Sequence, residues 1–287
     1  MKIESIRLKN FKSFKDVGLR DLPRFCVLIE ANGTGRLTFS SLFEFLKAAL
    51  SSNIHTALAK LGRSKGFTEV HSRGADGNIE IELKFQERRT APLVTYSLSI
   101  GERGGFPVVE SEVLKYRRGS SGRPWHFLDF SHGSGYAVTN ELNAVTDVSQ
   151  LERQEQTLKS PDILVIKGLA QFKSFPAVIA LGNLIEHWHT SDFHIDRARP
   201  EQEAGYAEHL SAKGENLALV TDFLYTKHRG IFDKILEKLA RHIPGLSQVD
   251  AKITETGRVS LRFQDGAFRD RSRHAMFQTA RSRCSLT

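Results

Sequence analysis

The feature that most constrains the fold is a glycine-rich turn between an apolar run and a helical pattern near the N-terminus. The run Phe25–Ile29 is continuously apolar, which is typical of a short strand buried on both faces. The turn 32–35 follows, and apolar residues then recur at helical spacing from Phe39 to Leu50, which predicts a helix of about 12 residues. At the start of such a helix the backbone N–H groups lack helical partners and can bind an anion. The sequence therefore predicts a phosphate-binding turn.

This turn matches part of the P-loop pattern G-x-x-x-x-G-K-[ST], in which backbone amides cradle phosphates. Gly35 is in place, but Glu30 replaces a glycine, Arg36 a lysine and Leu37 a serine or threonine. The hydroxyl at the position of Leu37 normally binds Mg²⁺, and Thr38 lies about 100° further around the helix. Glu30 also brings a negative charge to the site. We therefore predict weak nucleotide binding, no metal ligand in the loop and strongly reduced hydrolysis.

The chain resembles a known family at this point. The segment 9–14 (Lys-Asn-Phe-Lys-Ser-Phe) and the turn 31–35 (Ala-Asn-Gly-Thr-Gly) are similar to the "xNFRSF" strand and "GxNGxGKS" loop of RecF/SMC/Rad50-like AAA-type, ABC-class P-loop ATPases. Weaker similarities lie at 185–188 leading into 193–195, at 214–218, and at 244–245 with the hairpin that follows. The resemblance covers about residues 1–268. It implies an α/β fold: an ABC-type P-loop NTPase head with an inserted antiparallel β lobe and a helical segment.

The resemblance also implies a function and a set of site residues. The ligand would be ATP, with Mg²⁺ expected for the family, and ATP would drive homodimerisation of heads linked to DNA, in repair or in defence against foreign DNA. Gln171 is similar to the family's glutamine that senses Mg²⁺ and the γ-phosphate. The nucleotide-binding residues, carried over by position, would be Asn32, Gly33, Thr34, Gly35, Arg36, Leu37, Thr38, Lys12 and Ser13. The alternatives are a non-catalytic pseudo-ATPase that binds a partner protein, or a decayed, truncated gene product.

Hydrophobic periodicity divides the rest of the chain. Residues 2–8 and 17–22 predict a hairpin, and the runs 79–85, 93–100 and 108–116 predict antiparallel strands. Further on we expect a loop at 140–160, helices from 161, 176, 214 and 231, a short strand at 191–195 and a hairpin at 249–263. We divide the chain into a nucleotide-binding segment (1–50), a β-rich lobe (51–160), a helical segment with a return hairpin (161–268) and a basic, disordered tail (269–287).

Charge, cysteine content and hydropathy limit the partners and the compartment. The net charge is +8, and the tail from 269 to 287 holds five arginines and one aspartate, a net of +4. That tail is either a nucleic-acid-binding arm or an unselected sequence. The two cysteines, Cys26 and Cys284, are far apart and do not suggest a disulfide framework. No apolar run approaches the ~18 residues of a membrane span. We therefore predict a cytoplasmic protein without a membrane partner.

The tail stands where the resembled family continues with its signature motif and a strand ending in Asp-Glu. The chain has neither motif. Residues 276–287 can be back-translated with ordinary codons so that a shifted reading frame spells VSDGTIKMFAY, which is similar to the family's "SDGT" signature segment. We therefore expect a frameshift near residue 270 that truncates the head. The nucleotide sequence tests this expectation.

Overall fold

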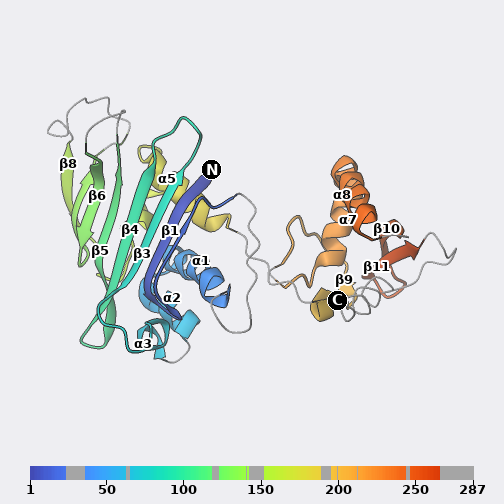
Figure 1. The fold of residues 1–287 in the computed structure, drawn as a ribbon, viewed down its shortest axis with the longest axis horizontal. Helices are drawn as coiled ribbons and strands as arrows, with labels where there is room; N and C mark the ends of the chain where they lie inside the picture. Colours follow the sequence, from blue (N-terminus) through green and yellow to red (C-terminus); the bar gives the residue numbers. More distant parts are fainter. Residues whose placement is uncertain are drawn as a thin grey trace. The chain divides into compact units, whose positions relative to one another are not determined.

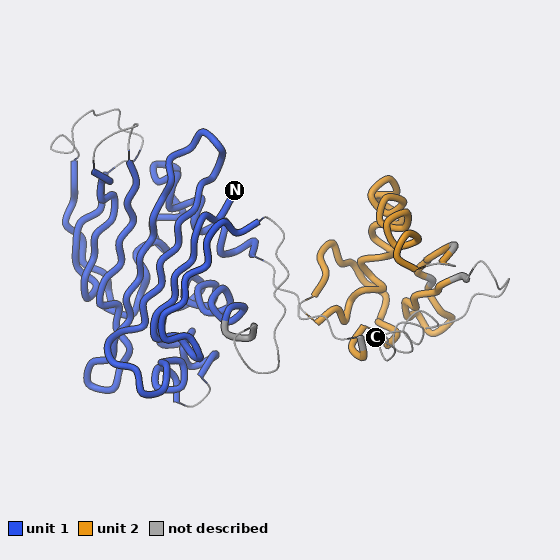
Figure 2. Tube along the Cα trace, in the orientation of Figure 1, with its two compact units in different colours: residues 1–188 blue, residues 189–287 orange. Residues whose placement is uncertain are grey.

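The computed structural model describes residues 1–23, 36–62, 65–117, 123–139, 141, 152–188, 195–198, 200–211, 213–243 and 246–265. The protein has a mixed α/β architecture with a large antiparallel sheet and several helices. It divides into two compact units, unit 1 (residues 1–188) and unit 2 (residues 189–287), which are coloured separately in Figure 2.

Unit 1 is built on an eight-stranded sheet in which each neighbouring pair is antiparallel. In spatial order the strands are β2 (Phe14–Arg20), β1 (Lys2–Phe11), β3 (Ile79–Gln86), β4 (Val94–Arg103), β5 (Phe106–Tyr116), β6 (Trp125–Ser131), β7 (Ser134–Val138) and β8 (Arg153–Thr157). The strand predictions for 2–8, 17–22, 79–85, 93–100 and 108–116 are confirmed. Their alternation has the expected cause, because every second residue of β3 is buried.

The helices of unit 1 cover one face of this sheet (Figure 1). They are α1 (Arg36–Ser51), α2 (Ile54–Gly62), α3 (Phe67–Val70), α4 (Val165–Leu169) and α5 (Pro176–Glu186). Helix α1 confirms the predicted helix, and its buried side chains include Phe39, Leu42, Phe43 and Leu46. The helix is longer than predicted, at 16 residues. These helices and the inner face of the sheet share one hydrophobic core.

Two buried glutamates accept hydrogen bonds from the N-terminal ends of helices α4 and α5. Glu112 on β5 accepts hydrogen bonds from the backbone N–H groups of Val165 (2.6 Å) and Ile166 (3.1 Å) at the start of α4. Glu141 accepts one from the N–H of Ala177 (3.0 Å) at the start of α5. Acceptor oxygens are favourable at this end of a helix because the first N–H groups have no helical partners. The two carboxylates therefore fix where α4 and α5 begin.

Unit 2 is smaller and has its own core. Its elements are α6 (Ile195–Ala198), β9 (Gln202–Glu203), α7 (Leu217–Lys227), α8 (Arg229–His242), β10 (Leu246–Ile253) and β11 (Arg258–Asp265). The three strands form a sheet in the order β10-β11-β9. The core packs α7 and α8 against the hairpin through Ala218, Phe232, Val249, Val259, Leu261 and Phe263. The helices expected from 214 and 231, and the hairpin at 249–263, are confirmed.

The structure differs from the sequence-based organisation in several respects. The helix expected from 161 begins only at Val165. Of the short strand expected at 191–195, only Ile195 is among the described residues, and it begins helix α6. The loop expected at 140–160 is wrong in its second half, because strand β8 closes the sheet there. All five residues of β8 are exposed at the sheet edge, so the sequence of the strand is polar and predicts a loop. The boundaries expected at 50 and 160 also differ from the two units. Strand β1 pairs with β3, so the N-terminal strands and the β-rich lobe share one sheet. Helices α4 and α5, which follow residue 160, belong to the same unit as that sheet. Within the described part of the chain, the helices are too short or too polar to cross a membrane.

Candidate phosphate-binding site

The site expected from the sequence is only partly within the described residues. The apolar run 25–29, Glu30 and the turn residues Asn32, Gly33, Thr34 and Gly35 lie outside them. Arg36, Leu37 and Thr38 form the first residues of α1, and only their helical backbone is described. The geometry of the site therefore rests on α1 and on Lys12 and Ser13, which form the tight turn between β1 and β2.

Lys12 is directed at α1. Its ammonium donates a hydrogen bond to the hydroxyl oxygen of Ser41 at 3.0 Å. Ser41 is a buried residue of α1, five positions after Arg36, which corresponds to about 7.5 Å along the helix axis. The positive charge of Lys12 is thus held beside the N-terminal half of the helix that the glycine-rich turn precedes.

The backbone around Lys12 is fixed by a second segment of the chain, residues 70–78. The N–H of Lys12 donates to the carbonyl of Val70 at 2.6 Å. The buried hydroxyl of Ser72 lies 2.8 Å from the carbonyl oxygen of Lys12 and 2.9 Å from that of Phe14. Asn10 donates to the carbonyls of Asp76 and Asn78 at 2.8 and 3.0 Å. Asn10 and Lys12 both have positive φ, at 56° and 52°, a conformation that these surrounding bonds stabilise.

Among the described residues, only distant carboxylates offset the positive charge of Lys12. Burial lowers its pKa, and the more distant carboxylates of Glu44 and Glu69 only partly oppose this. Among the residues that the structure describes, no carboxylate lies within ion-pair distance of Lys12. A half-buried cation whose described polar partner is a hydroxyl gains more from an arriving anion than an exposed lysine does, because less water screens the attraction.

The other two predicted residues, Ser13 and Gln171, are both exposed. Ser13 is exposed in the turn beside Lys12. Gln171 is exposed in the turn after α4. Four residues earlier, Lys167 donates to the carbonyl of Ser52, immediately after the C-terminal end of α1. Since α1 is roughly 24 Å long, Gln171 lies toward the opposite end from Arg36, and the structure does not bring it together with Lys12.

Aromatic residues that the sequence reasoning did not assign to the site lie on the same half of α1. Phe43 stacks on Trp188, with ring centroids 3.6 Å apart and planes inclined by 6°, and Phe39 packs edge-on against the same indole. Phe39 is three residues from the start of the helix. Trp188 is therefore a natural fluorescent reporter of this end of α1. The contacts made by residues 70–78 could not be found in the sequence either, because each involves a backbone group and the segment has no periodicity.

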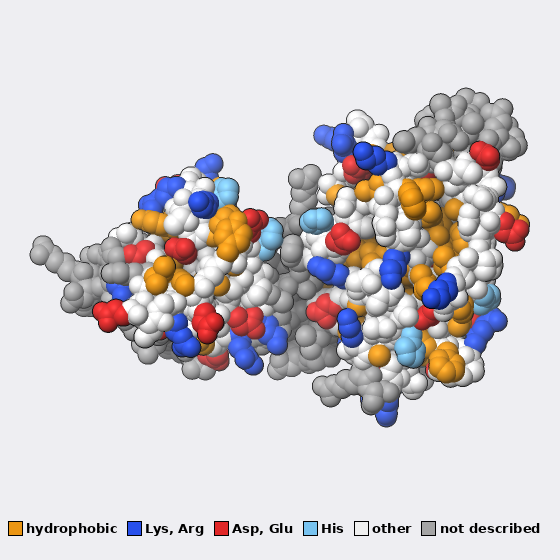
Figure 3. Space-filling model, turned by 180° about the vertical axis from the view of Figure 1, so that it is seen from behind, with side chains coloured by type: hydrophobic (Ala, Val, Ile, Leu, Met, Phe, Trp, Pro, Cys, Tyr) orange, Lys and Arg blue, Asp and Glu red, His pale blue; other side chains and the backbone are white. Residues whose placement is uncertain are grey.

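The face of the molecule in Figure 3 bears on the expected DNA partner. Lys and Arg side chains on it alternate with Asp and Glu side chains and do not gather into one basic area.

Comparisons with known proteins add no assignment: a scan against protein-family models and a search of curated proteins each gave no match.

Proposed function

We propose that this chain is a RecF/SMC-like P-loop head protein that binds ATP or a related nucleoside triphosphate, with impaired hydrolysis. The amides of residues 32–36 would hold the phosphates, and Lys12 would supply a positive charge from the side. ATP-dependent association of two copies and a DNA partner are part of the same proposal. They rest on the resemblance of residues 9–14 and 31–35 to the family's motifs.

The observation that carries the proposal is the position of Lys12. Its ammonium is 3.0 Å from Ser41 on α1, is half-buried, and comes from a turn fixed by at least three hydrogen bonds. A tight turn that holds a partly desolvated lysine against the first half of a helix is costly unless an anion is stabilised there. An ordinary turn between two strands at the surface does not require a half-buried lysine.

The loop sequence supports binding without efficient turnover. The residues available at 36 and 37 fit a phosphate but not a metal: Arg36 keeps a positive charge, whereas Leu37 has no oxygen for Mg²⁺. When bound in such a loop, Mg²⁺ would neutralise charge between the β- and γ-phosphates. In this chain Lys12 and Arg36 would have to balance the phosphate charge.

Nucleotide titration of the full chain tests the proposal. Tryptophan fluorescence, to which Trp188 contributes, and thermal stability would be followed with ATP, with and without Mg²⁺. We expect saturable binding, and we expect Lys12→Met to weaken it about 10- to 30-fold, which corresponds to roughly 1.4–2 kcal/mol for a charge about 5 Å from a phosphate in a partly screened site. Lys9→Met is the matched control, because Lys9 lies on β1, three residues before Lys12, but pairs with Glu80 at 3.1 Å. Equal affinities for the two variants, or no binding by the parent chain, would contradict the proposal.

Phosphate release separates the proposed function from its alternatives. Binding without release supports a pseudo-ATPase, and we expect the triple variant Glu30→Gly, Arg36→Lys, Leu37→Ser to raise the release rate. Equal turnover by the parent chain and the triple variant would show that the substituted loop is not impaired. A chain that neither binds nor hydrolyses ATP would support a decayed gene product.

A further inference from the structure

The outer face of the unit 1 sheet carries a row of hydroxyl side chains. Cross-strand pairing places Ser99 opposite Ser111, and Ser131 opposite Ser134, which is itself opposite Thr157. The Ser131 hydroxyl donates to the carbonyl of Glu110, which links β6 to β5 at the same level. Five adjacent strands, β4 to β8, thus present hydroxyls in one line. In contrast, the neighbouring strands β1 and β3 carry charged residues that pair with one another, such as Lys9 with Glu80.

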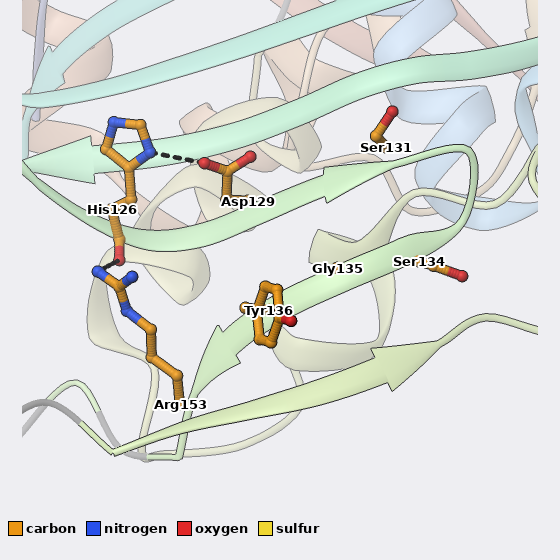
Figure 4. Close-up of a pocket in the computed structure, with 7 residues that line it drawn as sticks. All are labelled: His126, Asp129, Ser131, Ser134, Gly135, Tyr136 and Arg153. Carbon is orange, nitrogen blue, oxygen red and sulfur yellow. Dashed lines mark hydrogen bonds and ion pairs between the residues drawn. The ribbon is translucent and has the colours of Figure 1, made fainter.

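A hollow of about 370 Å³ opens on this face at β6, β7 and β8. Figure 4 shows its side chains on one side of the three strands, with Tyr136 between Asp129 and Arg153. The hollow is lined by His126, Asp129, Ser131, Ser134, Gly135, Tyr136 and Arg153. Its size is within the range of small-ligand sites.

Tyr136 is an exposed aromatic residue of the hollow. Half of its surface (51%) is accessible, and no ring among the described residues lies against it. It is directly opposite Asp129 in the β6–β7 pair. An exposed aromatic ring surrounded by polar groups offers apolar contact and hydrogen bonding together, which is characteristic of recognition surfaces.

The polar groups of the hollow are held in place but keep free bonding capacity. His126 Nδ1 is 2.7 Å from a carboxylate oxygen of Asp129, so the other oxygen of Asp129 is available as an acceptor. Arg153 donates one N–H to the carbonyl of His126 at 3.4 Å and has four further donors. The charges of Asp129 and Arg153 balance, so a strongly anionic or cationic ligand gains little. A neutral ligand with many hydroxyls can use the acceptor, the donors and the serines at once.

We propose that this hollow binds a sugar ring of a neutral oligosaccharide. Tyr136 stacks against the C–H face of the ring, Asp129 accepts from its hydroxyls, and Arg153 donates to them. Ser131, Ser134 and Thr157 contact adjoining sugar units along the hydroxyl row. This hollow shares no residue with the nucleotide site, so a result that overturns one proposal leaves the other unaffected.

The test is a calorimetric titration of the full chain with three neutral hexasaccharides, of β-1,4-linked glucose, α-1,4-linked glucose and N-acetylglucosamine. We expect at least one to bind with a Kd of about 0.1–10 mM, as is usual for a shallow, water-exposed site. Tyr136→Ala and Arg153→Ala should each weaken binding at least tenfold, and Tyr136→Phe, which keeps the ring, less than threefold. Tyr206→Ala is the control, because Tyr206 is an exposed tyrosine of unit 2 outside the hollow (71% accessible).

Because Tyr136 and Arg153 are exposed, these variants should fold, and circular dichroism and melting temperature check this. Loss of binding in a folded Tyr136→Ala variant with binding retained by Tyr206→Ala supports the site. Failure of all three hexasaccharides to bind the parent chain overturns the proposal. Equal binding by Tyr136→Ala and the parent chain places the sugar elsewhere and also overturns it.

Discussion

Glu112 should make the stability of unit 1 depend on pH in an unusual direction. Its side chain is completely buried and accepts hydrogen bonds from the N–H groups of Val165 and Ile166 and from the hydroxyl of Tyr96. Burial outweighs these bonds and raises the pKa of Glu112 from 4.5 to about 7. The folded state therefore holds a proton on Glu112 at pH values where the unfolded chain has lost it.

The magnitude follows from the shift in pKa. Between pH 4.5 and about 7 the folded state binds more protons than the unfolded state, so the contribution of Glu112 to stability falls as pH rises through this window. One pKa unit corresponds to about 1.4 kcal/mol, so the full change is about 3 kcal/mol. Below pH 4.5 and above about 7 this contribution is constant. Most paired carboxylates produce the opposite trend, because their pKa values are lowered on folding.

The perturbation is Glu112→Gln, and the assay is urea unfolding at several pH values from 5 to 8. Tryptophan fluorescence reports on unit 1 specifically, because the chain has two tryptophans, Trp125 and Trp188, and both lie in that unit. Glutamine removes the titration, and its amide N–H₂ leaves one backbone N–H without an acceptor, which costs about 1–3 kcal/mol. The parent chain should lose about 2.5 kcal/mol relative to the variant between pH 5 and 8, because pH 5 already lies above the unfolded pKa. A difference that does not change with pH would refute a raised pKa for Glu112.

Three further substitutions test the packing of unit 1 by urea unfolding. Phe43→Ala should cost about 3–5 kcal/mol, because it removes a buried ring stacked on Trp188; a cost below about 1 kcal/mol would contradict that packing. Gly135→Ala should cost about 1–3 kcal/mol, since an added Cβ would lie 2.2 Å from the carbonyl oxygen of Asp129, and an unchanged stability would argue against this close approach. Arg7→Ala should cost less than about 1 kcal/mol, because its 2.7 Å ion pair with a β2 carboxylate is exposed, and a larger loss would indicate a role beyond that pair.

The parts of the fold that the sequence predicts are those with a strong local pattern. Strand β3 and helix α1 have clear periodicity, and both were found. Strand β8 was missed because an exposed edge strand needs no apolar alternation, so its polar sequence resembles a loop. The caps formed by Glu112 and Glu141 were missed for another reason. A buried glutamate is identical in sequence to a solvated one, and only the fold reveals which helix it meets.

The candidate phosphate site illustrates the same limit, and Ser72 allows it to be tested. Ser72 is 2% exposed, and its hydroxyl and N–H hold the carbonyls of Lys12, Phe14 and Asn10. Ser72→Ala should cost about 1–3 kcal/mol of stability, because it removes the hydroxyl that serves the part-buried carbonyls of Lys12 and Phe14. It should also weaken ATP binding by loosening the turn that positions Lys12. Lys12→Met should weaken binding with little loss of stability, since removing a partly desolvated charge relieves a cost. If Ser72→Ala lowers stability and leaves ATP affinity unchanged, the turn does not position the lysine for a phosphate.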